Sequence, residues 1–102
     1  MRLTEKELAA IISVFKELFL VEDHVWLFGS RTDDSKKGGD IDLYIETNYT
    51  DYAVIFEKKI RFKSLLKLKI GDQKIDVVIK SQASKADLVI YDEAQRTGIK
   101  LI

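Results

Sequence analysis

Apolar residues recur at helical spacing in two long segments of the chain. The first follows Thr4 and Glu7, which fit a capping box, and contains Leu8, Ile11, Ile12, Phe15, Leu18 and Phe19. The second spans residues 51–70 and meets Gly71, a residue suited to end a helix. We therefore expect two amphipathic helices. The alternation of Leu66, Leu68 and Ile70 before Gly71 leaves a hairpin as the alternative for the last helical turn.

Three shorter segments are typical of β-strands, and a final helix and tail follow them. The strands are expected at 24–28, 40–46 and 74–80, and the composition of residues 32–39 indicates a mobile, hairpin-like loop. Ser84 is suited to cap a last helix through Leu88, Ile90 and Ala94, which Gly98 can end. The apolar tail of Ile99, Leu101 and Ile102 can pack on the domain or on a partner. Packing on the domain is favoured, because a small core needs every apolar residue.

Helices that alternate with strands predict an α+β fold, in which a small mixed β-sheet has helices packed against it. The 102 residues fit a single domain over 1–102. Because strand pairing is a long-range property, the pattern leaves the order of the strands open.

Composition favours a globular protein with 46% apolar and 33% charged residues. Cysteine is absent, which excludes disulfides and thiolate metal sites. The net charge of zero argues against non-specific attraction to nucleic acid, and no direct sequence-specific nucleic-acid binding is expected. The first twenty residues resemble neither a signal peptide nor a membrane span, so a cytoplasmic location and no membrane partner are expected.

One segment of this neutral chain is strongly basic. Six lysine or arginine residues and no acidic residue lie between Lys58 and Lys69. A solvated helix face is favoured as their role over contact with a triphosphate or an acidic partner.

Two aspartates, Asp40 and Asp42, lie two positions apart on the second expected strand. Strand geometry directs both side chains to one face, where their like charges would repel and raise the pKa of one carboxyl group. A divalent cation is the simplest means of neutralising them, and carboxylate ligands suit Mg²⁺ or Mn²⁺. Asp76 is a third carboxylate among apolar residues of the third strand, and it joins the same face if the two strands pair.

A second group of candidate residues follows the first strand. Gly29 allows close backbone approach to a phosphate, Ser30 and nearby amides can donate hydrogen bonds to it, and Arg31 can add charge near a triphosphate. For Lys36 and Lys37, a solvated loop is the favoured role. His24, the one histidine, is favoured as a structural residue over a general base.

Taken in order, Leu27-Phe28-Gly29-Ser30-Arg31, Asp40-Ile41-Asp42-Leu43 and Ile75-Asp76-Val77 resemble the signature of the minimal nucleotidyltransferases of the DNA polymerase beta superfamily. Residues 91–99 are also similar to the last helix and tail of that family. The resemblance implies the polymerase-beta-like palm fold and an enzyme of the EC 2.7.7 type.

Residue roles follow from the same resemblance. It implies that Asp40 and Asp42 bind two Mg²⁺ or Mn²⁺ ions, and that Asp76 helps to bind one ion and activates the incoming hydroxyl. It further implies that Gly29 and Ser30 hold the nucleoside triphosphate, with ATP as the donor of AMP. Positioning by the protein combined with charge stabilisation by two metal ions suits such a phosphoryl displacement.

The residues of this sequence are used in one core, without a separate domain to bind the acceptor. We therefore expect another protein to supply the acceptor. The resemblance to stand-alone proteins of this family implies that the partner is a HEPN-family ribonuclease toxin. It further implies that AMP is attached to a tyrosine of the toxin and that this chain is the antitoxin. The alternative is a non-catalytic antitoxin that masks its toxin by contact. A third hypothesis, regulatory nucleotide sensing, predicts ATP binding without pyrophosphate release.

Overall fold

Every expected helix and strand has a counterpart in the computed structural model, which describes residues 1–33, 39–81 and 89–102. The helices are α1 (Glu5–Leu18), the short 3₁₀ helix η1 (Gly29–Thr32), α2 (Tyr52–Ile70) and α3 (Val89–Thr97). The strands are β1 (His24–Phe28), β2 (Ile41–Thr47), β3 (Ile75–Ser81) and β4 (Ile99–Lys100). The architecture is α+β, as the alternation of helices and strands predicts.

The four strands form one mixed sheet in the order β3-β2-β1-β4. β1 pairs with β2 and with β4 in antiparallel fashion, whereas β2 and β3 run parallel. The two strands can run parallel because α2 carries the chain back to the end of the sheet where β2 begins, and β3 starts there. This topology places the beginning of β2 beside the beginning of β3, at the end of the sheet where η1 follows β1.

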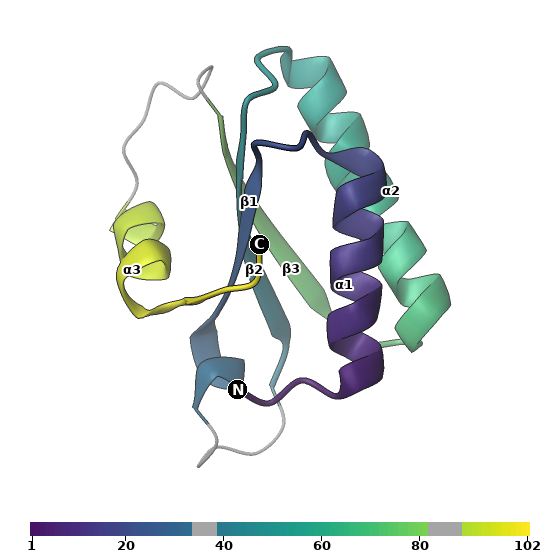
Figure 1. Cartoon of the computed structure of the whole chain (residues 1–102), viewed down its shortest axis with the longest axis vertical. Coiled ribbons are helices and arrows are strands. Elements are labelled where there is room, and N and C mark those ends of the chain that lie inside the picture. The colour runs from purple at the N-terminus through teal and green to yellow at the C-terminus, as the bar shows by residue number, and fades with distance from the viewer. Residues whose placement is uncertain (34–38, 82–88) are drawn as a thin grey trace.

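The main core lies between one face of the sheet and the pair of helices α1 and α2 (Figure 1). Alternate residues of each strand enter it, such as Leu27, Leu43 and Val77, and they meet Phe15 of α1 and Phe62 of α2. A capping box begins α1. The Thr4 hydroxyl accepts a hydrogen bond from the amide of Glu7, the third residue of the helix, and the Glu7 carboxylate accepts one from Thr4 N.

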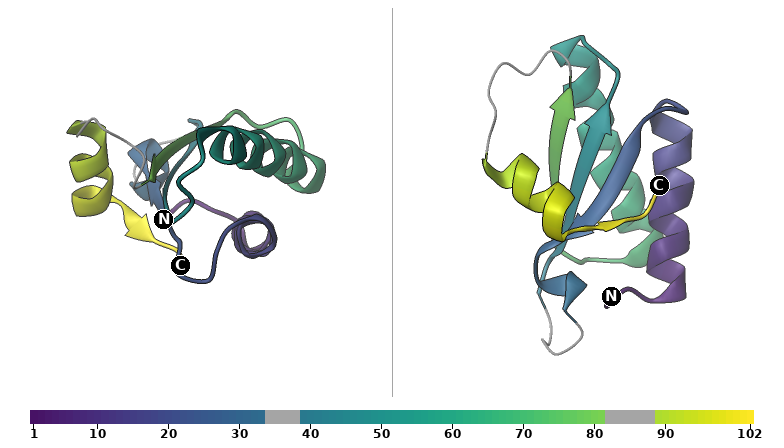
Figure 2. Two further views of the ribbon diagram at one scale, coloured as in Figure 1. Left: turned by 90° about the horizontal axis from the view of Figure 1, so that it is seen from above. Right: turned by 60° about the vertical axis from the view of Figure 1, so that its left-hand side comes forward.

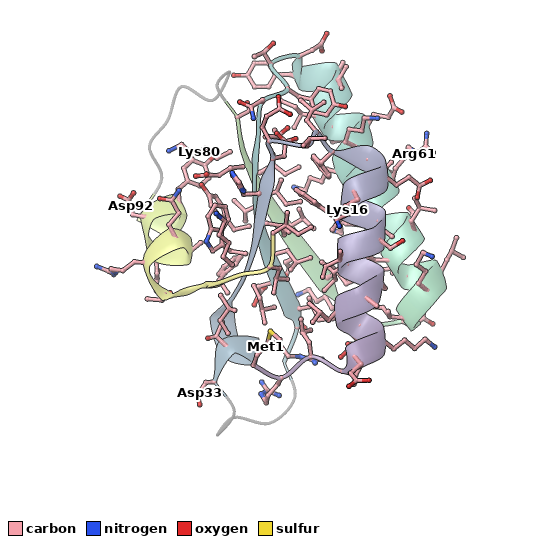
Figure 3. All side chains as sticks on the ribbon, viewed as in Figure 1. Met1, Lys16, Asp33, Arg61, Lys80 and Asp92 are labelled. Carbon is pink, nitrogen blue, oxygen red and sulfur yellow. The ribbon has the colours of Figure 1, made fainter. Side chains whose placement is uncertain are left out.

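The opposite face of the sheet is covered in part by α3, so the sheet is the middle of three layers (Figure 2). Tyr44 is fully buried there, with its ring 5.2 Å from that of Trp26 and 5.8 Å from that of Tyr91. The hydroxyl of Tyr44 donates to Glu46 over 2.7 Å. Lys80 lies beside α3, with Nζ 5.5 Å from the Tyr91 ring centroid (Figure 3).

Several boundaries and one alternative are corrected by the structure. β2 and β3 each lie one residue later than expected, at 41–47 and 75–81. The hairpin alternative for the end of α2 is wrong, because the helix continues to Ile70 and ends at Gly71, whose φ of 90° suits glycine. Ser84, Leu88, Lys36 and Lys37 lie outside the described residues. The apolar tail packs against the main core, as expected, and Ile99 forms β4 together with Lys100.

Candidate functional site

Two of the three candidate carboxylates lie opposite one another on neighbouring strands. In the parallel register Asp42 pairs with Asp76, and both side chains leave the sheet on the face that carries α3, because the residues on either side of each enter the core. Asp40 precedes β2 and lies at the same end. The strand pairing that the sequence left open is therefore present, and it brings Asp76 to the face of the sheet from which Asp42 projects.

This arrangement alters the pKa of the Asp42 carboxyl group. Burial raises its pKa above the ordinary value, the neighbouring charges of Asp76 and Asp40 raise it further, and Lys74 opposes them. A hydrogen bond between the side chains of Asp42 and Asp76 also favours the protonated form. The pKa shift is the one expected for crowded carboxylates, and a bound cation would reverse it by favouring the charged form.

Gly29 closes the site from the end of β1. Its φ is +75°, and a Cβ at this position would collide with Asp42 Oδ2 and lie 3.2 Å from Asp42 Cγ. Glycine is required here for two reasons, the left-handed backbone and the contact with the carboxylate. Ser30 is the next residue, within η1, so the backbone turn that carries the expected phosphate-binding pair borders the Asp42 carboxylate directly.

Arg31 occupies a position that the sequence did not predict. Its guanidinium donates to Arg2 O over 2.8 Å and to Gln73 Oε1 over 3.0 Å, and it lies 3.7 Å from Glu7 Oε1. Its Nε also donates to Gly39 O, one residue before Asp40. These contacts fasten η1 to the start of α1 and to the turn before β3. The role of Arg31 in nucleotide binding stays a prediction, and its observed contacts support the scaffold.

Glu7 anchors this scaffold from α1. It is 5% exposed, and its carboxylate accepts a hydrogen bond from Gln73 Nε2 over 2.6 Å. Burial acts to raise its pKa, but the hydrogen bonds from Thr4 and Gln73 and the charge of Arg31 outweigh burial and lower the pKa below 4.5. The sequence identified Glu7 only as a capping residue, because its other partners lie far away along the chain.

Lys74 is a further site residue that the sequence analysis missed. Its Nζ lies 3.5 Å from Asp40 Oδ2, and both side chains are partly exposed to solvent. The signal was present in the sequence, since Lys74 lies two positions before Asp76 and shares its strand parity. Asp40 thus has a cation from the protein itself, which a metal ion would have to replace.

The remaining polar groups on this face lie towards the opposite end of the strands. A pocket of about 470 Å³ there is lined by residues that include His24, Glu46 and Lys80. Glu46 is four positions along β2 from Asp42, or about 13 Å at the usual strand rise. His24 makes a 3.2 Å contact from Nδ1 to Ile102 O, consistent with the expected structural role. The pocket and the carboxylates therefore lie at opposite ends of the strands.

The family of the chain follows from a comparison with protein-family models. The model described as "Nucleotidyltransferase domain" matches residues 8–99, which include η1, the three aspartates and α3. The chain belongs to the nucleotidyltransferase domain family. The comparison with curated proteins found no match. The four-stranded mixed sheet with its helices is consistent with the fold of this family, within the DNA polymerase beta superfamily.

Nucleotidyltransferase domains move a nucleoside monophosphate from a nucleoside triphosphate, and the family in general uses divalent metal ions. Within residues 1–33, 39–81 and 89–102, no three acidic, histidine or cysteine side chains already converge on a metal position. In that part of the chain the Asp42 side chain is hydrogen-bonded to Asp76, and Asp40 Oδ2 lies 3.5 Å from Lys74 Nζ. The donor set nevertheless fits Mg²⁺ or Mn²⁺, because its hard carboxylate oxygens repel one another without a cation. Across the same described residues, no helix is long and apolar enough to cross a membrane.

Proposed function

We propose that this protein is a metal-dependent nucleotidyltransferase that transfers AMP from ATP to a hydroxyl group of a HEPN-type toxin and thereby acts as its antitoxin. The observation that carries the catalytic part is the pairing of Asp42 with Asp76 across parallel strands, with Gly29 against Asp42. Structural carboxylates are seldom placed opposite one another, because the pair destabilises the sheet unless a cation lies between them.

In the proposed site, Asp40, Asp42 and Asp76 would hold two Mg²⁺ or Mn²⁺ ions. When bound, the ions supply charge stabilisation to the attacking and leaving oxygens of an in-line displacement. Gly29 and Ser30 position the triphosphate through the backbone turn of η1. Asp40 would then exchange its ion pair with Lys74 for a contact with a metal ion, and the lysine ammonium group would be available to the phosphates.

The transfer itself needs no covalent enzyme intermediate. The acceptor hydroxyl oxygen forms a bond to the α-phosphorus of ATP, and the bond from that phosphorus to the β-phosphate oxygen breaks. Pyrophosphate leaves, and the hydroxyl proton passes to the Asp76 carboxylate. The fixed register of β2 and β3 keeps this base beside Asp42 throughout.

The identity of the acceptor rests on the resemblance of the sequence to stand-alone antitoxins of HEPN-type toxins. The experiment is co-production with the HEPN-type partner, followed by intact mass spectrometry of that partner. We expect a mass increment of one AMP, lost in the Asp40→Asn, Asp42→Asn variant. The Glu17→Gln, Glu93→Gln variant, which removes two exposed charges elsewhere, is expected to retain it.

Two outcomes would contradict parts of this proposal. Absence of the increment with ATP and Mg²⁺ present would argue against AMP transfer to that partner. If the Asp40→Asn, Asp42→Asn variant still neutralised the toxin in full, contact alone would be sufficient and the protein would be a non-catalytic antitoxin.

A further inference from the structure

The surface of α2 carries large apolar side chains that are exposed to solvent. Tyr52, Phe56, Ile60 and Leu68 are 62%, 65%, 49% and 82% exposed, respectively. They follow a spacing of four residues, with Ser64 at the one remaining position. Because each four-residue step advances about 40° around the helix, they form an inclined row that winds about 160° around α2 from Tyr52 to Leu68. The core-facing row of α2 contains Phe62 and Leu66, both fully buried. The exposed row is therefore distinct from the row of α2 that packs in the core.

This arrangement is unusual for the molecule as a whole. The exposed large apolar residues of the described chain are these four together with Met1 and Val21. Isolated apolar residues on a surface are ordinary, whereas an aligned group on one helix is typical of a surface that binds a partner. We refer to Tyr52, Phe56, Ile60 and Leu68 as the α2 apolar row.

The charges beside the α2 apolar row indicate what kind of partner fits it. α2 contains six lysine or arginine residues and one glutamate, a net charge of +5 in a chain whose total is zero. Lys59, Lys63 and Lys67 form a parallel row next to the apolar one, again at a spacing of four. Arg61 projects from the outer side of α2, away from the sheet (Figure 3).

We propose that the outer face of α2 is a docking surface for an acidic amphipathic helix of a partner protein. An apolar seam on the partner would cover the α2 apolar row, and flanking glutamate or aspartate side chains would pair with the lysine row. A second copy of α2 is disfavoured as the occupant, because two such helices would place net charges of +5 against each other. Nucleic acid would pair with the lysines but leave the apolar row uncovered.

The location of this surface makes it independent of the nucleotidyltransfer site. α2 packs on the core face of the sheet, whereas Asp42 and Asp76 project from the face that carries α3. A partner held on α2 would leave the carboxylates accessible. The docking surface therefore goes beyond the proposed function, and the two can be tested separately in one set of variants.

The test uses a fluorescein-labelled helical peptide, matched to α2 in length, with a leucine seam flanked by glutamates. We expect fluorescence anisotropy to report binding that weakens as salt rises. Binding should weaken at least about tenfold, or about 1.4 kcal/mol, in the Phe56→Ser, Ile60→Ser variant. The matched control is Val21→Ser, since Val21 is 98% exposed but lies outside α2, and it is expected to bind as the unmodified protein does.

A charge exchange gives the sharper result. In the Lys59→Glu, Lys63→Glu variant, the glutamate peptide should lose affinity, and a peptide with the same leucine seam but flanking lysines should gain it. Equal affinity of both peptides for the unmodified protein would overturn the proposal, as would no binding of the glutamate peptide.

Other occupants have their own signatures. Self-association that Phe56→Ser abolishes in light scattering would identify a second copy, and cosedimentation with phosphatidylserine vesicles would identify a membrane surface. Either result would replace the proposal. Binding of an ATP analogue by the Phe56→Ser, Ile60→Ser variant should remain unchanged, so a loss of peptide binding is distinguished from failure of the nucleotide site.

Discussion

Replacement of Gly29 by alanine tests the connection between the backbone turn of η1 and the carboxylates. The substitution adds one methyl group with two consequences. Its φ of +75° is a left-handed conformation that costs alanine about 1–2 kcal/mol. The new Cβ would also collide with the Asp42 carboxylate, which must move by roughly an ångström to restore van der Waals separation. The first effect acts on stability, and the second acts on the site.

The magnitudes follow from these two effects. For a chain of this size, 1–2 kcal/mol corresponds to a fall in Tm of roughly 5–15 °C. Displacement of Asp42 should weaken the metal-dependent binding of an ATP analogue by about tenfold to a hundredfold, or about 1.4–2.8 kcal/mol. Tm is measured by circular dichroism, and affinity is measured by calorimetric titration with Mg²⁺ at a temperature where both proteins are folded.

Gly71 provides a control for the backbone effect. It has a φ of +90°, and a Cβ there would meet no atom within 4 Å. Gly71→Ala should therefore lower Tm by at least a similar amount and leave nucleotide affinity unchanged. The reasoning is refuted if Gly29→Ala binds the analogue as tightly as Gly71→Ala does.

Three further predictions concern the buried and paired carboxylates. Glu7→Gln keeps a capping side chain for Thr4 but removes the charge facing Arg31, so urea unfolding should show a loss of about 2–3 kcal/mol at neutral pH. Because the pKa of Glu7 is lowered, the difference in unfolding free energy between the two proteins should be complete above pH 4.5 and should vanish as the pH falls through the lowered pKa. A difference that is independent of pH would contradict this prediction. The pKa of Asp42 is raised, so its charged form destabilises the folded protein. Without metal, Asp42→Asn should therefore raise Tm at neutral pH and have little effect below pH 3.8. A lower Tm of the variant at neutral pH in EDTA would contradict this prediction. Asp23 is 1% exposed and accepts hydrogen bonds from the α1–β1 turn and the end of β2. Asp23→Ala should therefore lower the free energy of unfolding by about 3 kcal/mol in the same assay. A loss under about 1 kcal/mol would count against this role of Asp23.

Local patterns predict much of this fold because each depends on residues close together in the chain. The capping box of Thr4 and Glu7 and the glycine at position 71 set helix ends through neighbouring backbone groups. Strand alternation likewise places Asp40 and Asp42 on one face whatever the strand pairs with. The two helix ends were predicted from the sequence and are present in the structure, whereas the shared face of Asp40 and Asp42 stays a prediction, because β2 begins only at Ile41.

Pairing between distant segments was beyond such reasoning. The opposition of Asp42 and Asp76 depends on a parallel register between β2 and β3, which α2 connects over nearly thirty intervening positions. β4 forms because Ile99 and Lys100 reach the open edge of β1, although two residues carry no strand pattern of their own. Arg31 likewise has its partners 24 and 42 positions away, at Glu7 and Gln73.

The central claim is that the carboxylate group holds a metal-bound nucleoside triphosphate. Its most direct test is calorimetric titration of a non-hydrolysable ATP analogue, with Mg²⁺ and with EDTA, into the unmodified protein and the Asp40→Asn, Asp42→Asn variant. The Glu17→Gln, Glu93→Gln variant controls for the change in net charge. We expect binding that requires Mg²⁺, that persists in the control and that is lost in the aspartate variant. Binding of equal strength in the aspartate variant, or no binding by any of the three proteins, would contradict the account.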